Sequence, residues 1–305
     1  MTETISTTTR IGVTRLAGNI GAEISGIDTA GLPSDDAVAQ IRQALLDHKV
    51  VFLRDQSLDY ARQVAFAERL GPLTLGHPTL ASPQDQPFLE EIDSHKGGRA
   101  NHWHTDVTFV LNPPQASTLR SIVVPPYGGE TLIANAGAAY RNLPGPLRAF
   151  ADTLRAVHTN DYDYAVPPES LNETQRERRK IFIATKYETA HPVVRVHPLT
   201  GERGLFIGGF AQRIVGLSKG ESYELLKILQ QYVTRPENIL RVTWEPGQLV
   251  LFDNRITQHY AIGNYDAAPR RLHRVTVAGD VPVGIDGQPS VAVAGDASRY
   301  TAVAS

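Results

Sequence analysis

The sequence contains no cysteine and only one methionine, and this absence narrows the chemistry that the protein can perform. Without thiols the chain forms no disulfide, holds no thiolate zinc or iron–sulfur site, and uses no cysteine nucleophile. Ten histidines and 32 aspartate and glutamate residues are present. Any metal site must therefore be built from imidazoles and carboxylates.

The sequence also lacks a large excess of either charge, long apolar runs and nucleotide-binding motifs. The 30 basic residues nearly balance the 32 acidic ones, which argues against a nucleic-acid binder with a basic face. No stretch reaches the roughly 18 apolar residues of a membrane span, and the first residues lack the apolar core of a secretory signal. Neither GxGxxG nor GxxxxGK[ST] occurs. We therefore expect a soluble, cytoplasmic protein that binds neither nucleic acid nor membrane.

The 305 residues alternate many short strand patterns with few helical ones. Residues 35–48, preceded by the capping residue Ser34, and residues 219–233 carry apolar side chains at helical spacing. Short strands are predicted at 50–53, 103–110, 117–124, 193–197, 204–207, 239–244, 249–253 and 272–279. This pattern favours a single α+β domain that is mainly β, a sandwich or barrel with flanking helices, over a doubly wound sheet.

Two polar stretches, 76–100 and 158–185, are predicted to be loops beside the active site. The first mixes Gly, Pro, Ser and charged residues, and the second contains the Pro-bearing, charged segment 160–180. Long loops in compact domains are often functional, and closure of both would exclude water from a site between them. The Thr- and Ser-rich residues 1–10 are expected to be disordered.

Candidate metal ligands lie in two segments. His104 and Asp106 share a face of the predicted strand 103–110, and His102 has the same parity. His-x-Asp is common by chance, so a half-buried polar strand end is the competing interpretation. His259 follows the apolar strand 249–253 in a polar turn. Two histidines and one carboxylate leave positions open for a chelating oxo-acid and O₂, as in the facial triad of non-haem Fe(II) oxygenases.

Arg270 and Arg274 lie on one face of the predicted strand that ends the domain. At about 3.3 Å per residue they are roughly 13 Å apart, so they could hold two different anions on either side of a central metal.

These segments resemble the TauD/TfdA family of Fe(II)- and 2-oxoglutarate-dependent dioxygenases, from about residue 11 to residue 285. The motifs that carry the resemblance are WHTDVTF at 103–109, GGETL at 128–132, FDNRITQHYA at 252–261 and RRLHRVT at 270–276. The resemblance implies one domain over residues 1–305, with a double-stranded β-helix (jelly-roll) core and flanking helices. It also implies a homo-oligomer, a dimer or tetramer.

The resemblance assigns roles to particular residues. The Fe(II) ligands fall on His104, Asp106 and His259. The cosubstrate 2-oxoglutarate, which reacts with O₂, falls on Thr131 and Arg270, because a bidentate arginine suits its distal carboxylate. A small anionic organosulfur substrate falls on His77, the backbone N–H of Val107, Phe206 and Arg274.

Two positions depart from the taurine-specific pattern. Ala100 and Leu80 stand where polar groups would hold an amine, and a buried ammonium without partners is costly. The chain is more similar to the alkylsulfatase branch, also at 158–164, 191–203 and 279–288. We therefore expect hydroxylation of the carbon next to a sulfate ester or sulfonate, with release of an aldehyde plus sulfate or sulfite, succinate and CO₂. An alkyl sulfate is the preferred substrate.

Three other interpretations are kept open by the sequence. The chain could be a taurine dioxygenase proper. It could be a zinc hydrolase in which the same His₂Asp set activates water, without need for O₂ or 2-oxoglutarate. It could also be a binding protein with an inactive site, although the complete ligand set and both arginines argue against that.

Overall fold

The computed structural model describes residues 10–97, 100–161 and 171–301. The largest sheet has seven strands in the order β1-β2-β3-β13-β5-β15-β4. Its strands are β1 (Gly12–Arg15), β2 (Ala22–Ser25), β3 (Val50–Leu53), β4 (Leu89–Asp93), β5 (Ala116–Val123), β13 (Leu249–Asp253) and β15 (Arg271–Val277). All pairs are antiparallel except β2 with β3. The predicted strands at 50–53, 117–124, 249–253 and 272–279 are thus confirmed.

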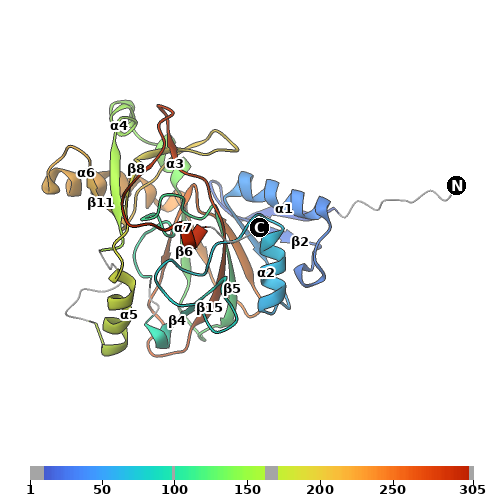
Figure 1. Cartoon of the computed structure of the whole chain (residues 1–305). Helices are drawn as coiled ribbons and strands as arrows, with labels where there is room; N and C mark the ends of the chain where they lie inside the picture. Colours follow the sequence, from blue (N-terminus) through green and yellow to red (C-terminus); the bar gives the residue numbers. More distant parts are fainter. Residues whose placement is uncertain (1–9, 98–99, 162–170, 302–305) are drawn as a thin grey trace.

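Alternation along the central strand β3 shows that both faces of this sheet are buried. In β3, Val50 and Phe52 point into one apolar cluster, while Val51 and Leu53 point into another. Successive side chains of a strand point to opposite faces, so a strand covered on both sides is apolar throughout. Helices α1 (Asp35–His48) and α2 (Tyr60–Glu68) pack on one face (Figure 1).

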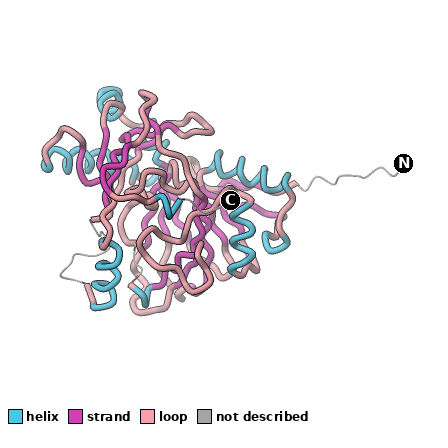
Figure 2. The backbone as a smooth tube through the Cα atoms, viewed as in Figure 1, coloured by secondary structure: helices cyan, strands magenta, loops and turns pink. Residues whose placement is uncertain are grey.

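The opposite face of the large sheet meets a three-stranded sheet in the order β12-β6-β14. These strands are β6 (Thr131–Asn135), β12 (Ile239–Val242) and β14 (Thr257–Ala261). Ile133 and Val242 pack there against Phe52, Leu119 and Phe252 of the large sheet. Strands therefore fill the interior and most helices lie outside them (Figure 2). The prediction of a mainly-β fold with jelly-roll sheets and flanking helices is confirmed.

Further strands and helices extend the molecule beside these sheets. A four-stranded sheet runs β11-β7-β8-β17, and a three-stranded one runs β10-β9-β16. The remaining elements are α3 (Ala136–Arg141), α4 (Gly145–Ala151), β7 (Arg155–Thr159), α5 (Glu173–Ile183), β8 (Glu188–Pro192), β9 (Val194–Val196), β10 (Arg203–Leu205), β11 (Ala211–Ile214), α6 (Lys219–Val233), β16 (Val283–Gly284), β17 (Val291–Ala294) and α7 (Ser298–Thr301). Within the described residues, every helix is too short or too polar to cross a bilayer.

Three predicted segments differ from the structure. The stretch 76–100 contains strand β4, because its apolar residues Leu89 and Ile92 join the sheet beside β15. The stretch 158–185 begins in β7 and carries helix α5, which Asn172 and Gln175 cap reciprocally. The expected strand at 103–110 is a turn in its central part. Residues 1–9, expected to be disordered, and 162–170 of the second loop lie outside the described residues.

Candidate active site

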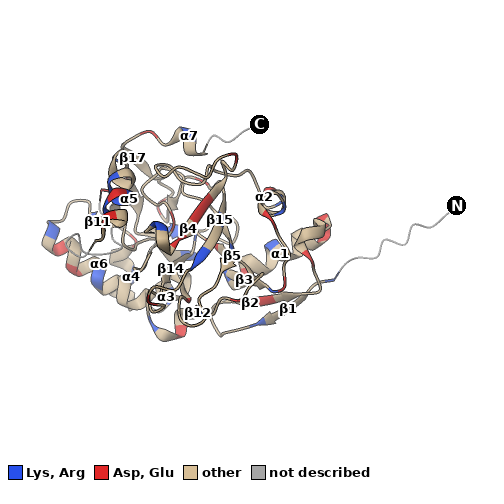
Figure 3. Ribbon diagram, turned by 90° about the horizontal axis from the view of Figure 1, so that it is seen from below, with Lys and Arg blue, Asp and Glu red and all other residues tan. Residues whose placement is uncertain are grey.

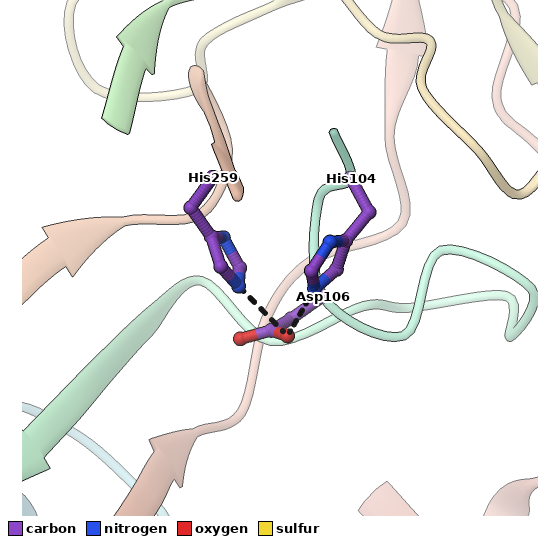
Figure 4. Close-up of side chains that lie close together, drawn as sticks. All are labelled: His104, Asp106 and His259. Carbon is purple, nitrogen blue, oxygen red and sulfur yellow. Dashed lines mark ion pairs between the residues drawn. The ribbon is translucent and has the colours of Figure 1, made fainter. Parts of the chain in front are cut away.

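Three buried side chains from two segments converge to form the centre of the site. The Nε2 atoms of His104 and His259 lie 3.8 and 3.5 Å from the same Oδ1 atom of Asp106. Figure 4 shows both imidazole rings directed at this carboxylate. Among the described residues this is the group of three histidine or acidic side chains whose ligand atoms, all within 4.8 Å of one another, could hold a metal ion.

Backbone pairing fixes the two histidines relative to each other. The N–H of His104 donates to the carbonyl of His259 (3.0 Å), and the N–H of His259 donates back (2.8 Å). The Nδ1 of His104 donates to the carbonyl oxygen of His102 (2.8 Å), so in the neutral ring Nε2, which lies toward Asp106, carries no proton. His102 therefore orients a ligand, and the imidazole of His102 lies outside the ligand group.

Asp106 reaches the site from a turn, and not by strand alternation as predicted. The side-chain amide of Asn254 accepts from the N–H of Asp106 (2.9 Å) and donates to its carbonyl oxygen (3.1 Å). The next residue, Val107, has a φ of +55°, which is strained for a β-branched side chain. Ser117 donates to Oδ2 of Asp106 (3.1 Å) and leaves Oδ1 facing the histidines. Asn254 thus holds the turn that presents Asp106.

The electrostatics of the trio suit a divalent cation. Burial lowers the pKa of His104 to about 3, so the ring is neutral at ordinary pH. Burial opposes ionisation of Asp106, but the charge of Arg274 holds its pKa well below the ordinary value. Neutral imidazole nitrogens and an ionised carboxylate oxygen are donors that Fe(II) accepts. The residues present therefore fit an iron centre of the facial-triad kind.

On one side of the centre, Arg270 and Thr131 form a hydrogen-bonded pair. Arg270 Nη2 donates to Thr131 Oγ1 (3.2 Å), and its Nε donates to the carbonyl of Gly129 (2.7 Å). Gly129 has a φ of +69°, and a side chain there would collide with Pro125 and Arg270. Thr131 Oγ1 also accepts from the Trp244 indole (3.0 Å), which leaves its own hydrogen for a ligand. The pair can bind a carboxylate.

On the other side of the centre, Arg274 is ion-paired with two carboxylates, Asp106 and Glu90. Glu90 is its neighbour across strands β15 and β4, and Figure 3 shows the basic part of β15 beside the acidic part of β4. The second oxygen of Glu90 lies 3.6 Å from Arg178 of helix α5. Neither Glu90 nor Arg178 belongs to a recognisable motif, so no sequence pattern indicates a role for them.

His77 lines the same pocket and is 9% exposed. Its Nδ1 accepts from the N–H groups of Thr79 and Leu80, both at 3.1 Å. A neutral ring then carries its proton on Nε2, which can donate to a ligand. Burial lowers the pKa of His77 to about 4, so a neutral donor is the form present near pH 7.

The predicted pocket aromatic, Phe206, is placed elsewhere by the structure. Phe206 packs between the His158 ring (5.6 Å between centroids) and the Arg195 guanidinium (5.2 Å), outside the pocket lining. Phe210 takes that place, with its ring edge-on to His104 at 6.0 Å. Both phenylalanines follow β10 in irregular backbone, where residue parity does not predict which side chain faces the site.

The pocket joins both anion-binding ends to an apolar wall. Its volume is about 1070 Å³ including the open mouth. Val107, His77, Arg274 and the trio line it, and so do Arg270 and Thr131, which belong to a separate hydrogen-bonded group. The wall consists of apolar side chains, four of them from the two predicted loops: Leu80, Ala100, Phe109, Leu171, Phe182 and Phe210. A ligand with an anionic head and an apolar tail matches this lining.

Comparison with known proteins agrees with this geometry. Residues 12–276 match the sequence profile described as taurine catabolism dioxygenase TauD, TfdA family. An alpha-ketoglutarate-dependent sulfate ester dioxygenase of Pseudomonas putida is 50% identical, over 90% of this chain and 92% of the relative. An alkylsulfatase of Acinetobacter baylyi is 47% identical, over 92% of this chain and 89% of the relative.

Solved structures give the same result at the level of the fold. A putative alpha-ketoglutarate-dependent taurine dioxygenase from Burkholderia xenovorans superimposes with a TM-score of 0.82 at 41% identity, over 94% of this chain and 99% of that one. Because the match covers 94% of this chain, it includes the central sheets and most of the motifs that carry the site. The chain belongs to the TauD/TfdA family of dioxygenases, which use Fe(II), 2-oxoglutarate and O₂.

Proposed function

We propose that the protein is an Fe(II)- and 2-oxoglutarate-dependent dioxygenase that acts on alkyl sulfate esters. The observation that carries the substrate class is the pocket lining, where an anion-binding end meets an apolar wall that includes Leu80 and Ala100. Neither side chain can bind an ammonium group, whereas both can pack against an alkyl chain. The names of the two relatives at 50% and 47% identity support this choice.

In this proposal each end of the pocket has a separate task. His104, Asp106 and His259 hold Fe(II), which supplies the oxidative chemistry with O₂ and 2-oxoglutarate. Arg270 and the Thr131 hydroxyl bind the distal carboxylate of 2-oxoglutarate. Arg274, the Nε2–H of His77 and the N–H of Val107 bind the sulfate group, and the apolar wall excludes water from the reacting carbon.

The reaction hydroxylates the carbon that carries the ester oxygen. One oxygen atom of O₂ enters this carbon, and the other enters 2-oxoglutarate, which loses CO₂ and becomes succinate. The hydroxylated carbon then loses sulfate as its hydroxyl proton departs, which leaves an aldehyde. A sulfonate would instead yield sulfite.

The test is a substrate panel with the purified protein, Fe(II), 2-oxoglutarate and O₂. We expect succinate and sulfate to form in equal amounts from a medium-chain alkyl sulfate, and little succinate from taurine. Asp106→Ala is the control for the metal site. Fast succinate release with taurine and none with the alkyl sulfate would contradict the proposal. Sulfate release without O₂ and 2-oxoglutarate would favour the zinc hydrolase.

Taurine dioxygenase is the second candidate, and Glu90 favours it. This carboxylate lines the pocket and could meet an ammonium group, and the matched Burkholderia xenovorans structure carries that name. Against it, Glu90 already pairs with Arg274 and Arg178. We further propose that the chain is one domain, acts in the cytoplasm and forms a dimer or tetramer, which sedimentation of the purified protein tests.

A further inference from the structure

The short helix α7 lies outside the segment that matches the family profile, which ends at residue 276. Its residue Tyr300 nevertheless lies at the back of the pocket. The side chain is 2% exposed and belongs to one apolar cluster with Val107, Phe109 and Phe210, three residues that line the pocket. The chain therefore returns to the active site after its recognisable motifs have ended (Figure 1).

Tyr300 is joined to the segment that carries His77. Its carbonyl oxygen accepts from the N–H of Leu75 (3.1 Å), two residues before His77. Leu75 also packs against the cluster that contains the Tyr300 ring. No strand includes residues 74–77, so contacts such as this one hold the segment in place.

Tyr300 is also joined to the strand that carries Arg274. Its buried phenol oxygen lies near the hydroxyls of Thr74 and Thr276 but makes no hydrogen bond within the described residues. Those two hydroxyls are 2.5 Å apart, and the N–H of Thr74 donates to the carbonyl of Thr276 (3.0 Å). Thr276 lies two residues after Arg274 on β15 and therefore on the same face. Burial raises the pKa of Tyr300 to about 12, so the phenol stays neutral at working pH.

Three separate segments therefore meet at one side chain. The His77 segment, the Arg274 strand and the Val107 turn each supply one of the proposed sulfate contacts, and each packs against or within the Tyr300 cluster. We propose that Tyr300 is a positioning residue that fixes these three contacts relative to one another. The inference rests on the proposed function of that end of the pocket. At the proposed 2-oxoglutarate end, Arg270 and Thr131 are held by hydrogen bonds to each other, to Gly129 and to Trp244.

The test separates the two ends of the pocket by their KM values. In Tyr300→Leu we expect the KM for the alkyl sulfate to rise at least tenfold, while the KM for 2-oxoglutarate stays within twofold. Tyr300→Phe keeps the ring and loses the hydroxyl, so we expect a rise of about threefold in the same KM only. Tyr140→Leu is the matched control, because Tyr140 is a tyrosine of α3 buried in a cluster that shares no residue with the pocket lining.

A second measurement needs no substrate. Amide hydrogen exchange at Leu75 should be at least tenfold faster in Tyr300→Leu than in the wild type, and unchanged in Tyr140→Leu. Equal rises in both KM values, or an unchanged alkyl sulfate KM in folded Tyr300→Leu, would overturn the inference. If Tyr300→Leu does not fold, an unchanged KM and unchanged Leu75 exchange in Tyr300→Phe would overturn it. Lack of wild-type turnover of any alkyl sulfate would instead contradict the proposed function, and the exchange measurement would still decide the role of Tyr300.

Discussion

Arg270, directly before β15, and Arg274, within it, are four residues apart and line the same pocket, yet they are held in opposite ways. Arg270 is fixed by the neutral oxygens of Gly129 and Thr131. Arg274 is fixed by the carboxylates of Asp106 and Glu90. Within the described residues, no carboxylate is paired with Arg270.

Because of this difference, Arg270 is ready to bind its ligand, whereas Arg274 must exchange partners first. The full charge of Arg270 is available to a carboxylate, and the neutral oxygens orient its planar group. An anion can reach Arg274 only in competition with carboxylates that already neutralise it. Binding of a metal by Asp106 would withdraw one of these competitors. The cosubstrate end is thus preorganised, whereas the substrate end depends on what the centre already holds.

Removal of Arg270 should give the largest effect, because nothing else in its surroundings replaces its charge. We expect Arg270→Ala to lower kcat/KM for 2-oxoglutarate about 100-fold, since truncation of a buried charge that binds an anion typically costs about 2–5 kcal/mol. The KM for the alkyl sulfate should stay within threefold. Arg270→Lys should recover part of the loss, because a lysine cannot make two parallel hydrogen bonds. Steady-state kinetics with each substrate varied in turn measures this.

Removal of Arg274 should give a smaller effect at the opposite end. We expect Arg274→Ala to raise the KM for the alkyl sulfate about 30-fold. This effect is smaller than that of Arg270→Ala, because the sulfate must displace Glu90 in order to bind Arg274. Arg271→Ala is the matched control, since Arg271 points to the other face of β15 and is 3.9 Å from Glu91. If Arg274→Ala weakened 2-oxoglutarate binding as strongly as substrate binding, the division of the pocket into two ends would be wrong.

The two ends also differ in how far the sequence could predict them. Thr131 and His259 lie on strands, Arg270 directly precedes one, and His104 pairs with a strand, so the structure brings the motif residues that the sequence singled out into one pocket. Phe206 and the strand at 103–110 were mispredicted, because that part of the site is irregular backbone held by long-range contacts. The amide of Asn254 fixes Asp106 from 148 residues away in the chain.

Contacts of that kind have no local sequence pattern. The helix 35–48, the helix 219–233 and the strand 50–53 were predicted within one residue, since capping and apolar spacing are local signals. Glu90 and Tyr300 act through partners 184 and 225 residues away, Arg274 and Leu75. Only the folded chain brings such pairs together.

Removal of the charge on Glu90 should give the smallest effect, but it tests most directly whether the two arginines differ. If Glu90 competes with the sulfate for Arg274, then Glu90→Gln should lower the KM for the alkyl sulfate about threefold at low ionic strength. The gain should shrink as salt is added, and the KM for 2-oxoglutarate should not change. Glu91→Gln is the control next to it, because Glu91 faces the other side of β4 and pairs with Lys96. A higher KM in Glu90→Gln would mean that the carboxylate orients Arg274 toward the substrate, and that both arginines are preorganised after all.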